Sequence, residues 1–121
     1  MTREVTDRGS RIRVTALHTI PVGAKGYVKI ETNMGITGWG EVDSAPTVVK
    51  AAVEAPLSSQ VVTGLANIIE GEDPLSIDAC MERMSASATY YARDGVGLHA
   101  IAGINIALWD IAGKAYDQPI Y

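Results

Sequence analysis

The densest group of chemically capable side chains in this 121-residue sequence is a set of carboxylates between positions 70 and 78. Clustered carboxylates can hold a metal ion or act as acid and base. The members here are Glu70, Glu72, Asp73 and Asp78. They straddle the predicted end of one helix and the predicted start of the next, where acidic side chains cap free amides and favour the helix dipole. We therefore predict a capping role for this cluster.

The histidines and the cysteine also indicate structural roles. His18 and His99 are far apart and have no Cys or His neighbours at metal-ligand spacing. They are predicted to lie on a strand and at a helix start. Cys80 has no basic neighbour in the sequence that would lower its thiol pKa, and it lies beside the apolar positions Ile77 and Met81. We predict no metal site and an inert core thiol.

Two glycine-containing segments resemble phosphate-binding loops only in part. The segment 35–40 is rich in glycine but lies within a predicted strand, and it does not lead into a helix. Gly113 and Lys114 are followed by Ala115, where such a loop needs Ser or Thr. We predict no nucleotide site. Lys114 instead follows Asp110 at helical spacing, a pair that could join within the helix or bond across a domain junction.

Composition narrows the class of protein. The net charge is −4, and the ten Lys and Arg residues are scattered without a basic stripe, which argues against a nucleic-acid partner. The N-terminus is polar and lacks a signal peptide, and one cysteine cannot form an internal disulfide, so we expect a cytoplasmic protein. The longest apolar run, 96–109, is shorter than the ~20 residues of a membrane span, so no membrane segment is predicted.

The first third of the chain alternates apolar and polar residues with a period of two. This pattern predicts strands over 11–20, 27–32 and 36–42, after a disordered or extended N-terminus at 1–10. Glycine and proline predict a loop over 21–26, and Asn33 to Gly35 predicts a turn. The result is a three-stranded antiparallel meander.

Beyond Asp43 the period changes to about 3.6, which predicts helices. We expect them over 47–55 and 57–70, then from Asp73 and Pro74, and finally from Leu98 to near the C-terminus. The predicted fold is α+β, a meander followed by a helical bundle.

The last predicted helix is apolar around most of its circumference. Two stripes run along it, composed of Ile101, Ile104, Leu108, Ile111 and Ala115, and of Ala102, Ile106, Trp109 and Tyr116. A helix with so little polar surface must be covered from more than one side. We expect part of that cover to come from sequence that is not in this chain.

Three segments together carry a family resemblance. They are GITGWGEVDSAP, the GEDP helix start at 71–74, and IALWDIAGKAYDQPIY at the C-terminus. Their order and spacing resemble the N-terminal capping domain of the enolase superfamily, in its mandelate racemase and muconate lactonising group. The resemblance covers the chain from about Arg11 to Tyr121.

The resemblance implies a protein of two parts. Residues 11–97 would form the cap, and 98–121 would lead into a (β/α)₇β barrel that is absent from this chain. Superfamily members abstract the proton α to a carboxylate with a Lys or His base, and Mg²⁺ stabilises the enediolate. They act as acid-sugar dehydratases, racemases or cycloisomerases, often as homo-oligomers. Bases and metal ligands lie on barrel strands, so no catalytic or Mg²⁺-binding residue is expected here, and the 121 residues alone are predicted to be inactive.

In this family two loops of the cap close over the barrel and select a small carboxylate substrate. By position these are 20–26 and 42–47. Our candidates for substrate-specificity residues are Pro21, Val22, Lys25, Tyr27, Asp43 and Ser44. Lys25 is the first choice for contact with an anionic or hydroxyl-rich acid, and its alternative is a solvated surface charge. Tyr27 has the alternative of simple packing. The alternative function for the whole chain is a free-standing interaction domain whose apolar helix docks onto another protein.

Overall fold

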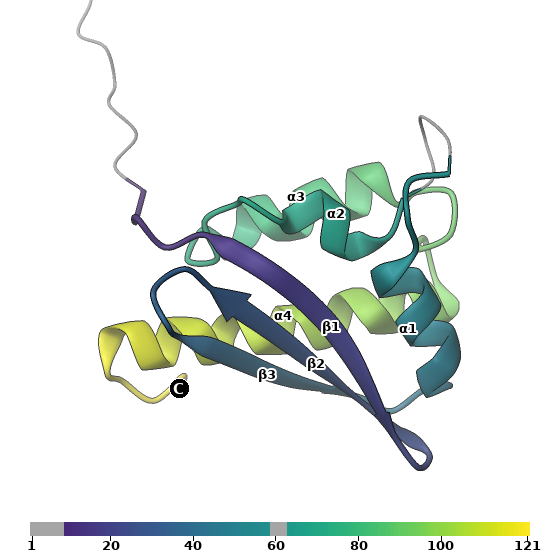
Figure 1. Cartoon of the computed structure of the whole chain (residues 1–121), viewed down its shortest axis with the longest axis horizontal. Coiled ribbons are helices and arrows are strands. Elements are labelled where there is room, and N and C mark those ends of the chain that lie inside the picture. Colours follow the sequence, from purple (N-terminus) through teal and green to yellow (C-terminus); the bar gives the residue numbers. More distant parts are fainter. Residues whose placement is uncertain (1–8, 59–62) are drawn as a thin grey trace, which may run out of the picture.

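A computed structural model describes residues 9–58 and 63–121. The chain forms a three-stranded antiparallel sheet in the order β1-β2-β3, composed of β1 (Val14–Val22), β2 (Lys25–Thr32) and β3 (Thr37–Val42). Helices cover one face of this sheet (Figure 1). The predicted meander and the α+β class are therefore confirmed.

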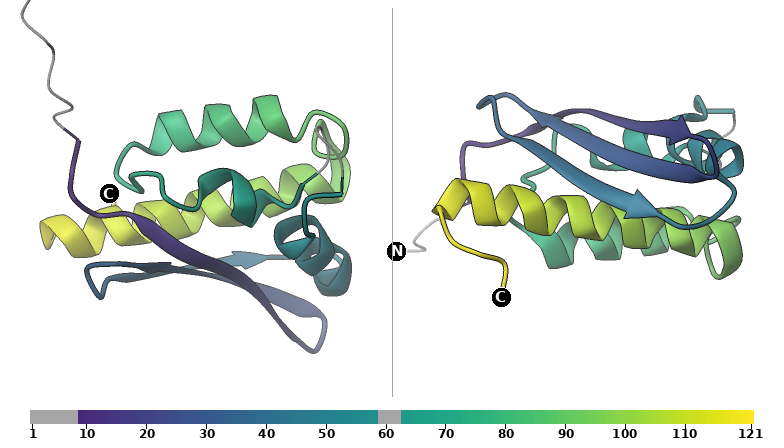
Figure 2. Two further views of the ribbon diagram at one scale, coloured as in Figure 1. Left: turned by 45° about the horizontal axis from the view of Figure 1, so that its top comes forward. Right: turned by 90° about the horizontal axis from the view of Figure 1, so that it is seen from below.

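Within the described residues four helices follow the sheet, namely α1 (Pro46–Glu54), α2 (Leu65–Ile69), α3 (Ile77–Ser87) and α4 (Gly95–Tyr116). The long α4 lies along the sheet and contacts β3, β2, α1 and α3. Figure 2 shows α3 on the side of α4 that faces away from the sheet. One stripe of α4 thus packs on strands while other helices cover part of its remaining surface.

The inner stripe of α4 is covered within this domain from Ile101 to Ile111, and its last member, Ala115, is half-buried. Ile101, Ile104, Leu108 and Ile111 are each at most 1% exposed, and Val28 and Ile30 of β2 are fully buried in the same core. Burying side chains of this size contributes about 1.5–3 kcal/mol each relative to exposure. The prediction of a buried stripe is confirmed for this half of the helix.

Glycines allow α4 and β3 to approach at backbone distance. A Cβ atom added to Gly40 would lie 2.1 Å from the carbonyl oxygen of Gly103, and one added to Gly38 would lie 2.3 Å from that of Ala107. No side chain fits in such a space. These two strand glycines therefore let the backbones of β3 and α4 pack in direct contact.

Helical ion pairs satisfy backbone groups at both free edges of the sheet. On β1, the carboxylate of Glu54 accepts the Thr19 N–H at 3.2 Å, and Lys50 donates to the Thr19 carbonyl at 3.0 Å. Lys50 and Glu54 also pair with each other, one helical turn apart. Unpaired strand groups invite other strands to add, and this pair blocks part of that edge.

The β3 edge has the same arrangement with residues of α4. Asp110 accepts the Trp39 N–H at 2.9 Å, and Lys114 donates to the Thr37 carbonyl at 2.7 Å. Lys114 also contacts the Asp110 carboxylate at 2.8 Å. The pair predicted from helical spacing forms, and it binds the neighbouring strand of this same domain.

Two predicted helices were wrong in extent. The helix expected over 57–70 is reduced to α2, and part of that prediction falls on 59–62, outside the described residues. Gly64 has extended backbone and donates its N–H to the Ala55 carbonyl at 2.9 Å. A Cβ added there would lie 2.5 Å from the same oxygen, so tertiary contact with the end of α1 overrides helix formation. Leu57 is exposed instead of buried.

The helix predicted to start at Asp73 and Pro74 begins at Ile77. Asp73 does cap an amide, because its carboxylate accepts the Leu75 N–H at 2.9 Å, but this bond closes a turn before the helix. The same carboxylate accepts the N–H and hydroxyl of Ser10, so it also holds the segment that enters β1. This competing long-range contact explains the later helix start.

The strand and loop boundaries near Pro21 were also wrong. β1 and β2 continue to a two-residue turn, so that Pro21 pairs with Gly26 and Val22 pairs with Lys25. Gly23 has a φ of 62°, the positive value that such hairpin turns need. Pro21 is tolerated because β1 is an edge strand. The expected six-residue loop is a narrow hairpin.

Among the described residues, α4 is the one helix with the length and hydropathy of a membrane span. Half of its most apolar window is nevertheless buried inside the domain. A core helix of a globular fold has the same properties, and the contacts of α4 with the sheet identify it as one.

Candidate substrate-facing loops and docking face

The fold brings the two predicted specificity loops to the same end of the molecule. The β1–β2 hairpin and the connection from β3 to α1 lie together at the lower right of Figure 1. They meet at their bases, where a Cβ added to Gly26 would be 3.4 Å from the Cβ of Pro46. A surface that contacts both loops is therefore physically available.

The candidates on these loops differ in exposure. Pro21 and Asp43 are exposed, and Val22, next to the hairpin turn, is 57% exposed. Ser44 is half-buried. Val22 is a branched apolar side chain with few rotamers, so it loses little conformational entropy when another surface contacts it.

Lys25 is held by a neighbouring strand. Its ammonium contacts the Glu41 carboxylate of β3 at 2.9 Å. The hydrogen bond and charge of Glu41 raise the pKa of Lys25 above its ordinary value, and Tyr27 and Asp43 add to this effect. Lys25 therefore remains a cation, with its charge offset by carboxylates.

Tyr27 lies on the solvent-facing side of the sheet. It pairs with Ile20 on β1 and with Glu41 on β3, and it is half-buried. Two residues further along β2 and on the same face, the Lys29 ammonium lies 5.7 Å from the centre of the Trp39 ring, a cation–π distance. Tyr27 thus shares the outer face with Lys25, next to the hairpin.

The outer stripe of α4 is not covered by the domain. Leu98, Ile106, Trp109 and Tyr116 are between 44% and 65% exposed, and their spacing places them on one side of the helix. Ile120 and Tyr121 of the C-terminal tail are exposed as well. The stripe follows a helix of 22 residues, about 33 Å long.

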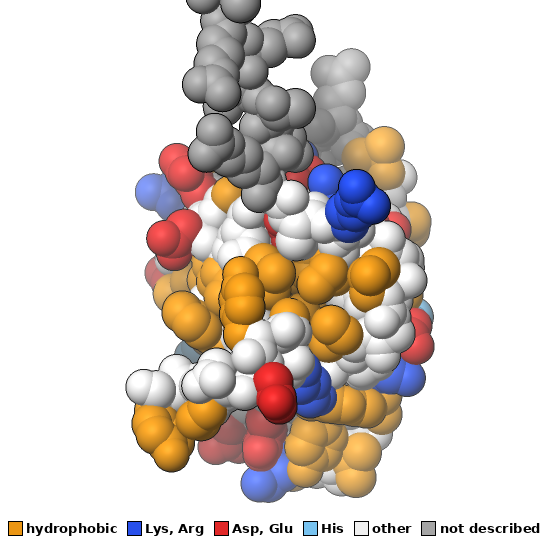
Figure 3. All heavy atoms as spheres, turned by 90° about the vertical axis from the view of Figure 1, so that its left-hand side faces the viewer, with side chains coloured by type: hydrophobic (Ala, Val, Ile, Leu, Met, Phe, Trp, Pro, Cys, Tyr) orange, Lys and Arg blue, Asp and Glu red, His pale blue; other side chains and the backbone are white. Residues whose placement is uncertain are grey.

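Apolar surface continues onto one end of the molecule. Figure 3 shows hydrophobic side chains gathered across the middle of the face at the left of Figure 1, where the C-terminal end of α4 and the β2–β3 turn lie. Met34 in that turn is 58% exposed. Exposed apolar surface of this extent is typical of an interaction face.

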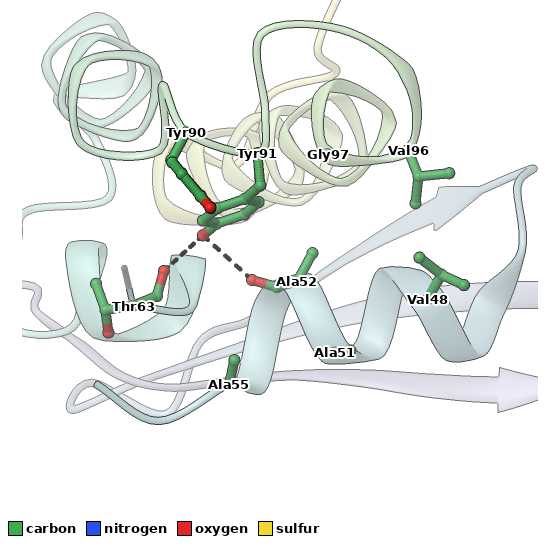
Figure 4. A pocket seen from close by; sticks show the side chains of 9 residues that line it. All are labelled: Val48, Ala51, Ala52, Ala55, Thr63, Tyr90, Tyr91, Val96 and Gly97. Atoms are coloured by element: carbon green, nitrogen blue, oxygen red, sulfur yellow. Dashed lines mark hydrogen bonds between the residues drawn. The ribbon is translucent and has the colours of Figure 1, made fainter. Parts of the chain in front are cut away.

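A groove of about 370 Å³ lies between α1 and the segment that leads into α4. Its lining is mainly apolar, as Figure 4 shows, and was not predicted from the sequence. The Tyr91 hydroxyl donates to the Thr63 carbonyl at 2.6 Å and lies 3.4 Å from the Ala52 carbonyl oxygen. Burial raises the pKa of Tyr91, so its hydroxyl stays protonated and donates to the carbonyl that links the two segments.

The two histidines and the cysteine lie where the sequence predicts them, on a strand, near a helix start and in the core. His18 lies on β1 beside Glu31 at 3.5 Å, and His99 lies near the start of α4. Cys80 is 1% exposed, and burial raises its pKa to about 11. The described part of the chain contains no group of three or more His, Cys, Asp or Glu residues that could hold a metal ion. Its donor set does not fit a Mg²⁺ site.

The fold is a three-stranded antiparallel sheet covered on one face by helices, an α+β domain. The chain belongs to the family described as mandelate racemase / muconate lactonizing enzyme, N-terminal domain, whose model matches residues 2–121. This match confirms the resemblance seen in the sequence.

Curated relatives are acid-sugar dehydratases. The chain is 36% identical over 113 residues to D-galactonate dehydratase of Variovorax paradoxus, and 38% identical over 111 residues to that of Xanthomonas campestris pv. campestris. These alignments cover 91% and 90% of the chain but 27% and 26% of the relatives. The chain therefore spans about a quarter of the length of the curated relatives that it matches.

Solved structures share the fold. An enolase of the mandelate racemase subgroup from Agrobacterium tumefaciens is 31% identical with a TM-score of 0.75, covering 89% of this chain and 28% of its own. A mandelate racemase/muconate lactonizing protein from Paracoccus denitrificans, complexed with magnesium, is 25% identical with a TM-score of 0.73. The match covers 91% of this chain and 29% of that protein's chain. In both, the shared domain is a minor part of a longer chain.

Proposed function

We propose that this chain is the substrate-specificity cap of a Mg²⁺-dependent enzyme that abstracts the proton α to a carboxylate. The reaction is acid-sugar dehydration, racemisation or cycloisomerisation, carried out by a cytoplasmic homo-oligomer. Metal ligands and catalytic bases belong to a second, barrel-shaped body, and the 121 residues alone are inactive. The relatives that match this chain over 90% of its length support the proposal, because they are dehydratases about four times as long.

The single observation that carries the proposal is the uncovered stripe of α4. Leu98, Ile106 and Trp109 are large and apolar, yet each is nearly half exposed and none belongs to the buried core of this domain. Such a stripe fits a permanent neighbour, which in a protein of this family is the barrel. Residues 98–121 would then serve both domains, with the inner stripe in the cap and the outer stripe at the junction.

The paired loops supply the specificity. Val22 and Pro21 would contact the part of the substrate that lies away from the reacting carbon, together with Lys25 and Tyr27 from the hairpin and Asp43 and Ser44 from the second loop. Closing such loops excludes water and uses distant contacts to orient the substrate. Their meeting at Gly26 and Pro46 supports joint action.

A second candidate function uses the same stripe. A free-standing domain could dock α4 onto a separate protein, without catalysis. The two functions differ in one consequence, because only the cap restores activity when it is joined to a barrel.

A domain exchange tests the proposal. This chain would replace the matching N-terminal residues of the Xanthomonas campestris D-galactonate dehydratase, and turnover of galactonate with Mg²⁺ would be measured. We expect Mg²⁺-dependent turnover of galactonate or of another acid sugar in a panel, since the catalytic groups of the barrel are unchanged while the loops that select the substrate are exchanged. A folded exchange protein that turns over no acid sugar, beside a parent that does, would refute the cap function.

A further inference from the structure

We propose that the part of the substrate facing the two loops carries no charge. The protein would then act on a monocarboxylate with a hydroxyl-bearing far end and would discriminate against a dicarboxylate. This inference rests on the proposed function, because it takes the loops to face the substrate. The charges on and beside those loops carry it.

The hairpin carries one cation, and the neighbouring β3 and second loop carry two carboxylates. Lys25 is the charged residue of segment 20–26, and its ammonium already contacts Glu41 at 2.9 Å. Asp43 is exposed on the second loop and contributes to the raised pKa of Lys25, so its charge acts on the same ammonium. One ammonium with two carboxylates leaves a net charge of −1 at this end.

The adjacent helix adds no free cation. Lys50 of α1 pairs with Glu54 and donates to the Thr19 carbonyl at 3.0 Å. Segments 20–26 and 41–54 contain no arginine. Both lysines of the described loops and α1 are therefore occupied by protein carboxylates.

This charge pattern selects between two kinds of substrate end. A second substrate carboxylate loses its hydration when it binds, so it needs a free cation or a bidentate arginine as a partner. A net charge of −1 beside it repels it instead. Hydroxyl groups need both donors and acceptors. Lys25 has three N–H donors, of which Glu41 takes one, and the oxygens of Glu41 and Asp43 can accept hydroxyl protons. A polyol end fits where a carboxylate does not.

The test compares one sugar acid with its diacid. The exchange protein described above would be assayed for kcat/KM with galactonate and with galactarate. In the double variant Glu41→Gln, Asp43→Asn we expect the rate with galactarate to rise about fivefold relative to galactonate, because two like charges are removed. The gain should shrink at about 0.5 M salt, where the screening length is roughly half of its value in physiological buffer.

A matched control removes two carboxylates elsewhere. Glu31→Gln, Asp78→Asn changes the net charge equally on β2 and α3, away from the loops. We expect its ratio of rates to stay within about 1.5-fold of the unmodified protein, since distant surface charges are screened. A second protein, carrying only segments 20–26 and 41–47 of this chain in the parent dehydratase, avoids any new domain junction.

The outcomes separate the two proposals. If folded exchange proteins turn over neither acid, the cap function fails and the present inference fails with it. If they turn over galactonate but the loop variant leaves the ratio unchanged, or shifts it toward galactonate, the cap function survives and the uncharged substrate end is refuted.

Discussion

The two faces of α4 contrast more sharply than any other pair of surfaces in this molecule. Gly103 and Ala107 face the sheet at backbone distance, Ile111 packs on it with its side chain, and all three are buried. Ile106 and Trp109 face outward and are nearly half exposed. The inner face is explained by packing within these residues. The outer face also carries large apolar side chains, and packing within the described residues leaves them nearly half exposed, which indicates that they serve another contact.

The largest expected effect is on the inner face. Gly40→Ala places a methyl group 2.1 Å from the Gly103 carbonyl, between two backbones that cannot yield as a flexible side chain would. We expect the free energy of unfolding to fall by about 3 kcal/mol or more, the upper end of overpacking costs. Urea unfolding followed by circular dichroism measures this.

Gly35→Ala is the control for that change. A Cβ added to Gly35 meets nothing within 4 Å, but its φ of 75° strains an alanine, so we expect a loss of about 1 kcal/mol. Equal losses for the two variants would show that close approach of α4 is not what holds β3.

Chemical labelling sharpens the same contrast between covered and uncovered side chains. Burial of the Cys80 thiol raises its pKa to about 11 from an ordinary 9.0. At pH 8 we expect its alkylation by iodoacetamide to be roughly 100-fold slower than that of a cysteine introduced by Ile106→Cys, because the thiolate is the reactive form. Mass spectrometry of timed samples measures both rates.

The raised pKa of Cys80 also makes the stability of the fold depend on pH. A folded-state thiol pKa above the unfolded value stabilises the fold fully below about pH 9, and this contribution is lost as pH rises through 11. Reaction of Cys80 as fast as the introduced cysteine at pH 8 would contradict its burial.

The β3 edge should show a smaller effect. Asp110→Asn keeps an acceptor for the Trp39 N–H but removes the charge that pairs with Lys114. We expect a loss of about 1 kcal/mol, since the pair is partly exposed and a charged hydrogen bond becomes a neutral one. Thermal unfolding measures it, and Lys114→Met should give a similar loss. Unchanged thermal stability in both variants would mean that the hydrogen bonds of Asp110 and Lys114 to the β3 edge do not stabilise the fold.

The smallest effect is expected on the outer face. Ile106→Ala should change the stability of the isolated domain by no more than about 0.5 kcal/mol, as is usual for surface sites. Its matched control, Ile104→Ala on the inner face, should cost about 2–5 kcal/mol. Urea titrations of the two proteins compare them directly. A large loss at Ile106 would mean that the domain itself uses this stripe.

The sequence predicted what local periodicity encodes. Alternation placed the three strands, and helical spacing identified the buried stripe of Ile104 and Leu108 as well as the second stripe. Whether the second stripe is covered could not be read from spacing, because Trp109 and Leu108 look alike in a helical pattern. Only the arrangement of α3 and the sheet shows which of them is buried.

Contacts between distant segments were the part that local patterns could not supply. The bond from Trp39 to Asp110 joins residues 71 positions apart, and the turn at Asp73 depends on Ser10. Likewise, Lys25 was the natural choice for a free cation on its loop, and only the pairing of β2 with β3 reveals its contact with Glu41. These three cases share one cause, which is tertiary contact that overrides a local preference.

Binding to a separate catalytic body tests the central claim most directly. This chain would be titrated with the Xanthomonas campestris dehydratase expressed without its N-terminal domain, using the unmodified chain, Ile106→Asp on the outer stripe and Tyr90→Asp as an exposed control away from it. We predict a one-to-one complex for the unmodified chain and for the control, whose Tyr90 precedes α4 and is not part of the outer stripe. We predict at least about tenfold weaker binding for Ile106→Asp, since a buried unpaired charge costs several kcal/mol. Equal binding by all three proteins, or no binding by any, would contradict the assignment of the outer face of α4 to a catalytic partner.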